Sequence, residues 1–82
     1  MTETIAISSS MQDYLEIILD LSEKEGLARV TDIADTLNIA KASVSQAVSS
    51  LRELGLVVQE KYGPVELTCI GKKLAVKVRH RH

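Results

Sequence analysis

The chain has 82 residues, a formal net charge of −1 and two aromatic residues. This length fits one small domain with a modest core, and so few aromatic residues argue against a base-stacking surface for single-stranded nucleic acid. The single cysteine excludes an internal disulfide framework and a multi-cysteine zinc site, and the apolar runs are too short to span a membrane.

Charge is distributed unevenly along the chain. Residues 1–25 contain six acidic residues and one lysine, whereas residues 56–82 contain six basic residues and two glutamates. Such polarity is typical of a protein that meets an anionic partner at one end and a cation at the other. Two solvent-exposed charged faces would give the same pattern, so both interpretations stay open.

The first predicted element is a helix that follows a flexible tail over residues 1–9. Ser10 is a favourable N-cap residue, and apolar residues recur at helical spacing up to Glu25. Gly26 is expected to end this helix. A short extended piece is predicted next, over residues 27–30.

Two further helices are predicted, joined by a tight connection. Thr31 is expected to cap the first, over residues 32–37, and Asn38 to end it in a left-handed conformation. The second is predicted over residues 41–54, where apolar residues again recur at helical spacing. Its predicted buried stripe consists of Val44, Ala47, Val48, Leu51 and Leu54.

A hairpin and a last helix complete the predicted fold. Residues 56–61 and 65–68 have the pattern of two strands, and a Tyr-Gly-Pro sequence at residues 62–64 supplies the turn between them. Thr68 is expected to cap a helix that runs to the end of the chain. The residues predicted to be buried on that helix are Ile70, Leu74, Ala75 and Val78. This order predicts an α+β, mostly α, winged helix-turn-helix with three helices, a two-stranded wing and a C-terminal helix.

Four short stretches carry a resemblance to a known family. They are Met11-Gln12-Asp13-Tyr14-Leu15-Glu16, Val30-Thr31-Asp32-Ile33-Ala34, Ser43-Val44-Ser45-Gln46, and Gly55-Leu56-Val57 through Glu60-Lys61-Tyr62 to Leu67-Thr68-x-x-Gly71. In this order and spacing, residues 10–82 resemble the N-terminal DNA-binding domain of the DtxR/MntR family of metal-dependent transcriptional repressors. The joint occurrence of the stretches is more specific than any one of them.

The resemblance implies that the helix over residues 41–54 enters the major groove of DNA. Its candidate DNA-binding residues are Lys41, Ser43, Ser45, Gln46 and Ser49. The residue pattern agrees, because these donors and acceptors lie mainly on the N-terminal half, where groove-reading residues usually lie. Gln46 can pair bidentately with an adenine edge, and the serines suit phosphates, bases or water bridges. Ordinary solvation of the helix would produce the same pattern.

The predicted wing departs from the family pattern. Related proteins often carry an arginine after the tyrosine of this turn, whereas this chain has Gly63-Pro64. The remaining candidates for contacts with the DNA backbone, on the wing and near the second helix, are Lys61, Tyr62, Arg29 and Thr31. The alternative is an ordinary solvent-exposed wing and loop. Loss of one phosphate contact predicts modest DNA affinity for a single copy of the domain.

The resemblance also implies a metal site between the first helix and the helical region after the wing. By motif position its ligands would be Asp13, Glu16 and His82. Oxygen ligands with one imidazole suit Mn²⁺ or Fe²⁺, and a carboxylate at position 13 resembles the manganese-type branch of the family. The alternatives are that Asp13 is only a capping residue, Glu16 part of a solvated face and His82 a frayed end.

The family continues into a dimerisation region, which also supplies the remaining metal ligands and is expected to be absent from this chain. The predicted function is sequence-specific binding of double-stranded DNA, on a palindromic operator, by a metal-dependent repressor or its DNA-binding domain. A homodimer is expected in the full-length context, in the cytoplasm and without a membrane partner. Two alternatives stay open: a metal-independent, MarR-like regulator and a winged-helix protein-interaction module. No catalytic signature motif is present, so the sequence does not predict an enzyme.

Overall fold

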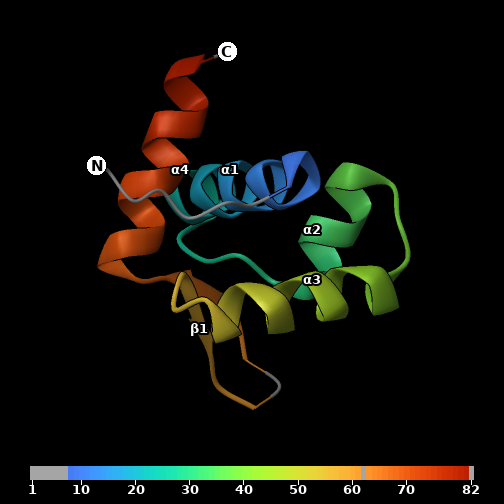
Figure 1. Cartoon of the computed structure of the whole chain (residues 1–82). Coiled ribbons are helices and arrows are strands. Elements are labelled where there is room, and N and C mark those ends of the chain that lie inside the picture. Colours follow the sequence, from blue (N-terminus) through green and yellow to red (C-terminus); the bar gives the residue numbers. More distant parts are fainter. Residues whose placement is uncertain (1–7, 62, 82) are drawn as a thin grey trace.

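The computed structural model describes residues 8–61 and 63–81, with the side chain of residue 81 left out. Four helices and one hairpin make up the described chain (Figure 1). Residues 1–7 of the predicted flexible tail lie outside the described residues. In chain order the elements are α1 (Ser9–Glu25), α2 (Val30–Leu37), α3 (Lys41–Glu53), β1 (Val57–Gln59), β2 (Val65–Leu67) and α4 (Cys69–Arg81).

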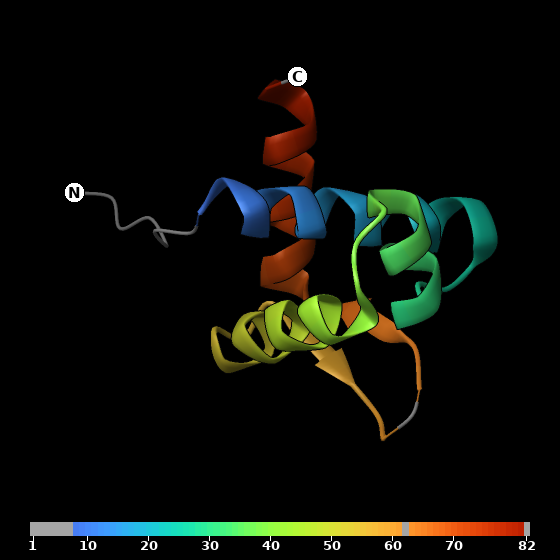
Figure 2. The same cartoon turned by 90° about the vertical axis from the view of Figure 1, so that its right-hand side faces the viewer.

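The predicted winged helix-turn-helix architecture is confirmed. α1 packs against α2, α3 and α4, and the β1–β2 hairpin projects from the side of the domain on which α3 lies (Figure 1). Seen after a turn of 90°, the hairpin again extends beyond α3, whereas the end of α4 extends beyond α1 on the opposite side (Figure 2). The domain therefore has an α3–wing side and an α1–α4 side.

α1 begins two residues earlier than the sequence predicts. Ser8, not Ser10, is the N-cap residue, and its side-chain oxygen accepts a hydrogen bond of 3.2 Å from the backbone N–H of Met11. Three consecutive serines offer the same capping group, so residue type alone does not select among them. The predicted end is confirmed, because Gly26 has a left-handed conformation with φ of 85°.

The start of α2 also differs from the prediction. Thr31 is exposed and lies inside the helix, which begins at Val30, and the N-cap residue Arg29 makes no side-chain capping bond. The start of α2 is instead set by Ala28, the residue before the N-cap residue. The carbonyl of Ala28 accepts a 2.7 Å hydrogen bond from the N–H of Val65, which holds Ala28 in a bridge with β2. The predicted left-handed C-cap at Asn38 is confirmed, with φ of 58°.

The wing is an antiparallel hairpin, as predicted, with shorter strands than the sequence suggests. Val57 pairs with Leu67, and Gln59 pairs with Val65. Because Ala28 bridges Val65 from the other side, the extended piece before α2 becomes a third, one-residue partner of the hairpin. This contact fixes the wing next to the start of α2.

The core is almost entirely aliphatic, and Tyr14 is the one aromatic residue buried in it among those described. Two residues predicted to be buried are exposed: Leu54 by 44% and Ile70 by 59%. Leu54 is the C-cap residue of α3 and lies beyond its last regular turn. Ile70 lies at the second position of α4, where the following residue, Gly71, faces the core instead. The largest fully buried side chains are Leu15, Ile18, Ile33, Leu51 and Leu56.

A close backbone contact seats the start of α4 against the turn between α3 and β1. The hydroxyl of Thr68 accepts a 3.0 Å hydrogen bond from the N–H of Gly71 and donates a 2.8 Å bond to the carbonyl of Gly55. Thr68 is thus confirmed as the cap of this helix. A Cβ at residue 71 would lie 2.8 Å from the carbonyl carbon of Leu56 and closer still to its oxygen. Only glycine allows this approach.

Candidate nucleic-acid interface

The exposed face of α3 carries all five of the candidate residues predicted on this helix. Its buried residues are Val44, Val48 and Leu51, so the helix is held to the domain by an aliphatic stripe. The rest of its surface presents short polar groups and three charged residues, Lys41, Arg52 and Glu53, to solvent. The predicted residues are all exposed: Lys41, Ser43, Ser45, Gln46 and Ser49. Such a helix offers hydrogen-bond donors and acceptors without large apolar side chains in between.

An open groove of about 450 Å³ lies where the start of α2, the N-terminal half of α3 and the wing meet. It brings four of the predicted residues together on one surface, although they come from separate elements. The groove is lined by Arg29, Val30, Thr31, Lys41, Ser45, Gln59, Gly63 and Pro64. Two of these residues are basic, and both are exposed, so the groove is suited to an anionic ligand.

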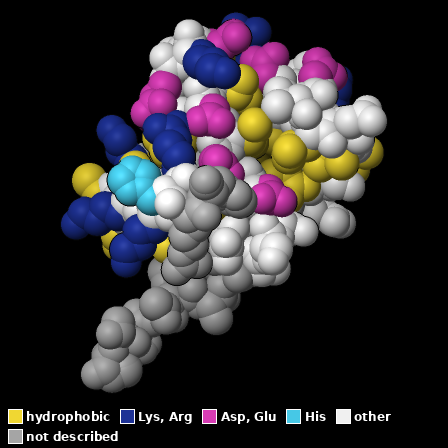
Figure 3. Space-filling model, turned by 90° about the horizontal axis from the view of Figure 1, so that it is seen from above, with side chains coloured by type: hydrophobic (Ala, Val, Ile, Leu, Met, Phe, Trp, Pro, Cys, Tyr) yellow, Lys and Arg dark blue, Asp and Glu magenta, His cyan; other side chains and the backbone are white. Residues whose placement is uncertain are grey.

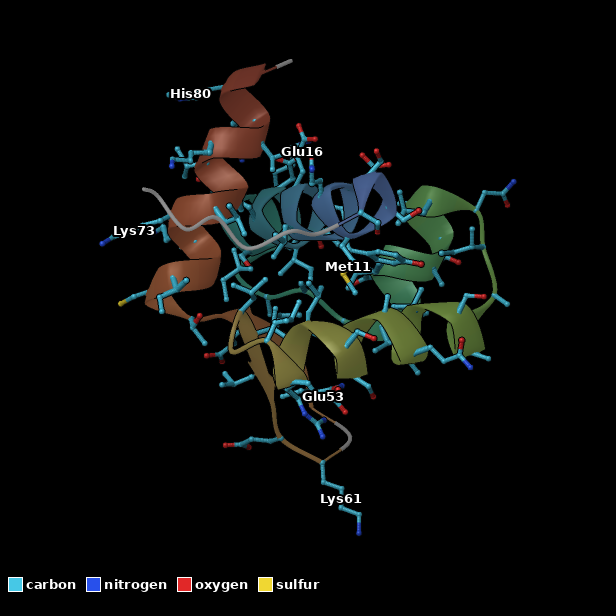
Figure 4. The ribbon with its side chains drawn as sticks, in the orientation of Figure 1. Met11, Glu16, Glu53, Lys61, Lys73 and His80 are labelled. Carbon is cyan, nitrogen blue, oxygen red and sulfur yellow. The ribbon has the colours of Figure 1, made fainter. Side chains whose placement is uncertain are left out.

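The wing turn is held by its own hydrogen bonds. The side-chain amide of Gln59 donates a 3.0 Å bond to the carbonyl of Gly63, whose N–H donates a 2.8 Å bond to the carbonyl of Glu60. Lys61 is exposed at the tip of the wing and points away from the domain (Figure 4). Tyr62 lies outside the described residues.

Gln59 is a residue of this groove that the sequence analysis did not single out. It is half-buried in β1, and its side chain reaches across the turn to Gly63. The sequence feature that could have identified Gln59 is its position: it is a long polar residue at the end of a strand that leads into a glycine-proline turn. Such a residue can bond the turn backbone, as this one does.

The candidate metal ligands lie on the other side of the domain. Asp13 is exposed and Glu16 is half-buried, and their spacing of three residues places them on one face of α1. Glu16 points from α1 away from α3 (Figure 4). His82 lies outside the described residues. Within residues 8–61 and 63–81, no three His, Cys, Asp or Glu side chains come close enough to hold a metal ion.

The donor chemistry of these residues fits part of a metal site. Two carboxylates on one helix face supply the oxygen ligands that Mn²⁺ prefers. Further ligands are needed to complete an octahedral sphere. Asp13 also borders a shallow hollow between α1 and the end of α2, whose other lining residues are Ser10, Tyr14, Leu37 and Ile39.

α3 packs against α2 through its buried aliphatic residues, exposes polar groups on its other faces and is followed by the β1–β2 hairpin. This arrangement is that of a winged-helix DNA-binding domain. The comparisons with known proteins give the family. Residues 6–65 match the family described as iron dependent repressor, N-terminal DNA binding domain, and the chain belongs to this family. Its members are DNA-binding transcriptional regulators, not enzymes.

Two curated relatives show the extent of the similarity. The HTH-type transcriptional regulator MntR of Geobacillus thermodenitrificans is 42% identical over 73 residues, which are 89% of this chain and 52% of that protein. The MntR of Bacillus subtilis is 41% identical over the same share of the chain and 51% of its own length. The chain thus spans about half the length of the curated relatives that it matches.

Solved structures agree with the fold. T. acidophilum IdeR matches 88% of this chain and 33% of its own chain, with a TM-score of 0.74 and 29% identity. The S. aureus MepR–DNA complex matches 92% of this chain and 56% of its own, with a TM-score of 0.74 and 21% identity, which shows the fold alone.

No helix in the described part of the chain is both long and apolar enough to cross a membrane.

Proposed function

We propose that the chain binds double-stranded DNA sequence-specifically through α3, as the DNA-binding domain of a metal-dependent transcriptional repressor. The observation that carries this proposal is the groove shared by α2, the exposed N-terminal half of α3 and the wing. In winged-helix regulators the corresponding helix enters the major groove, and the wing and neighbouring residues contact the backbone. Membership of the iron-dependent repressor family supports the same conclusion.

The residues divide into base-reading and backbone-contacting groups. Gln46 reads an adenine edge, which is worth about 1–3 kcal/mol of discrimination. The serines of α3, Ser43, Ser45 and Ser49, contact phosphates, base edges or bridging waters. The backbone contacts come from Lys41, Arg29, Thr31, Lys61 and Tyr62. The charged members of this group give the binding its salt dependence.

The metal dependence is proposed to lie on the α1–α4 side of the domain. Asp13 and Glu16, with His82, would hold Mn²⁺ or Fe²⁺ between α1 and the helical region after the wing. The bound cation would supply a charge that attracts ligands from both elements. In the cytoplasmic full-length protein, a homodimer would then present two α3 helices at the spacing of a palindromic operator.

The test is fluorescence anisotropy with a labelled AT-rich palindromic duplex, with and without Mn²⁺, at two salt concentrations. Tighter binding with Mn²⁺ supports the metal-dependent repressor. Equal specific binding in chelator favours the MarR-like alternative; a MarR family protein from Bacillus stearothermophilus shares the fold with a TM-score of 0.75. Absence of binding at low salt would overturn the proposal in favour of a protein-interaction module.

Variants separate base reading from electrostatic attraction. Gln46→Ala is expected to weaken specific binding more than non-specific binding, and equal loss on both duplexes would refute its reading role. Lys41→Ala is expected to reduce the salt slope by about 0.9 for one lost phosphate contact. Lys73→Ala is the matched control, because Lys73 is exposed on α4, away from the groove.

The metal ligands are tested in the same assay. Asp13→Ala is expected to abolish the effect of Mn²⁺ on DNA affinity, whereas Asp35→Ala, at an exposed position of α2, is expected to leave it intact. An unchanged Mn²⁺ response in Asp13→Ala would remove this residue from the site.

A further inference from the structure

One cationic side chain of α4 joins two carboxylates of α1. The guanidinium of Arg79 lies 2.6 Å from Oδ1 of Asp20 and 2.9 Å from Oε1 of Glu23, both measured from the same nitrogen. Its other terminal nitrogen lies 3.5 Å from Oε2 of Glu23. The three residues are referred to below as the Arg79 cluster. Asp20 and Glu23 are three residues apart, so α1 presents both to one guanidinium.

The Arg79 cluster lies where apolar packing of α4 ends. Val78 is 3% exposed and is the last residue of α4 in the buried core among those described, whereas His80 is exposed. The last turns of α4 extend past α1 in both cartoon views (Figures 1 and 2), and His80 points outward from them (Figure 4). The Arg79 cluster therefore adds a polar contact with α1 at the point where the buried residues of α4 end.

The charges around the cluster are of opposite sign on the two helices. Seen from the α1–α4 side, acidic side chains spread over the face, and several basic side chains gather at one edge beside a histidine, while others lie among the acidic ones (Figure 3). Hydrogen bonds to Glu23 and then to Asp20 raise the pKa of Arg79 above its ordinary value. The guanidinium is thus charged throughout the pH range in which proteins are studied.

We infer that Arg79 is a positioning residue that fixes the end of α4 against α1 by ion pairing, without a metal ion. The planar fork of arginine can bond two carboxylates at once in a defined orientation, which a lysine cannot reproduce. One such group therefore restrains both the distance between the helices and the rotation of α4. The side chain is only one-third exposed, so solvent screens this contact less than it screens a fully exposed pair.

A consequence for DNA binding rests on the proposed function. Asp20 lies four residues after Glu16, on the same face of α1 as the candidate metal ligands. A metal bound there would act on two helices that the Arg79 cluster already holds together. Weakening the cluster is therefore expected to lower the DNA affinity of the metal-free protein more than that of the Mn²⁺-loaded protein.

The first test uses backbone hydrogen exchange of residues 77–81 in the full chain, with chelator and without DNA. Arg79→Met keeps an unbranched, helix-favouring side chain and removes the charge, and it is expected to speed exchange about two- to tenfold. Lys77→Met, at an exposed position of the same helix, is the matched control and is expected to leave exchange unchanged.

Salt distinguishes ion pairing from simple packing. Raising NaCl to about 1 M, where the screening length is near 3 Å, is expected to speed exchange in the wild type and to have little effect in Arg79→Met. Arg79→Lys is expected to be intermediate. Equal exchange in wild type and Arg79→Met, or the same acceleration in Lys77→Met, would overturn the inference.

DNA affinity in chelator then tests the functional link. A lower metal-free affinity of Arg79→Met, restored by Mn²⁺, supports it. Faster exchange with unchanged metal-free affinity would confirm the positioning role and overturn its link to DNA binding. If the wild type binds no DNA at all, the proposed function fails, whereas the exchange result still decides the role of Arg79.

Discussion

Gly71→Ala tests the closest backbone approach in the domain. Gly71 faces the core from the first turn of α4, and its hydrogen-bonded N–H fixes the helix on the hydroxyl of Thr68. An added Cβ would lie 2.8 Å from the carbonyl carbon and 3.2 Å from the Cα of Leu56. Both are backbone atoms, so no side-chain rotation can relieve the overlap, and α4 must move away from the turn between α3 and β1.

Two opposing effects set the magnitude. Replacing glycine with alanine inside a helix normally stabilises it by about 0.5–1 kcal/mol. Overpacking of a close contact costs typically about 1–3 kcal/mol and more when backbone must move. We therefore expect a net loss of about 1–2 kcal/mol in the free energy of unfolding. For a domain of this size that lowers Tm by roughly 4–16 °C.

Urea denaturation and thermal unfolding, followed by helical circular dichroism, measure this loss. Lys72→Ala is the control, because Lys72 is the next residue along the same turn and is exposed, so its substitution should change stability by less than about 0.5 kcal/mol. Higher stability in Gly71→Ala would mean that helix propensity dominates. The close approach to Leu56 would then not be a real constraint on the fold.

Three further outcomes follow from the packing and the wing. Thr68→Ala is expected to cost about 1–2 kcal/mol in urea denaturation because the cap of α4 is lost, and full stability would contradict the capping role. Leu15→Ala is expected to cost about 2–5 kcal/mol in the free energy of unfolding as a core truncation, whereas Ile70→Ala should change it by less than about 0.5 kcal/mol. Similar losses in the two variants would contradict the burial of Leu15. Gln59→Ala is expected to speed amide exchange at Gly63, and unchanged protection there would exclude a bracing role for the side chain.

Helix ends that require an unusual backbone conformation were predictable from the sequence. Gly26, Asn38 and Gly55 follow apolar periodic segments, and all three have positive φ in the structure. Few residue types tolerate that conformation, so residue identity alone is informative at these positions. The boundaries that these residues set agree with the predictions to within one residue.

Helix starts were less predictable because they depend on contacts distant in sequence. Ser8 and Ser10 have the same capping chemistry, and only the structure selects Ser8. Thr31 has a better capping side chain than Arg29, yet α2 begins at Val30. The bridge that holds Ala28 determines that start, and it joins residues 37 positions apart. Periodicity and capping preferences contain no information about such a pairing.

In the candidate site, too, features set by local sequence were predictable and contacts between residues distant in sequence were not. Periodicity predicted which side of α3 is exposed, because Val44, Val48 and Leu51 define the buried stripe. It could not predict that Gln59 would reach into the groove or that Arg79 would meet Asp20, which lies 59 residues away in the sequence. Those contacts depend on how elements cross one another, and a single sequence does not state this.

The contact between the α3–β1 turn and the start of α4 would link the proposed metal site on the α1–α4 side to the proposed DNA-binding helix. The hydroxyl of Thr68 joins the carbonyl of Gly55 to the N–H of Gly71, and its own N–H bonds the carbonyl of Leu56 at 3.0 Å. Gly71 also approaches the backbone of Leu56 so closely that a Cβ would not fit, so side-chain rotamer changes alone cannot absorb a rotation of α4 there. A ligand that shifts α4 relative to α1 is thus expected to shift the end of α3 as well. A ligand that binds both arrangements equally would leave DNA affinity unchanged. The proposed effect of Mn²⁺ therefore requires that the metal favours one arrangement of α4 over the other, and a charge alone would not produce it.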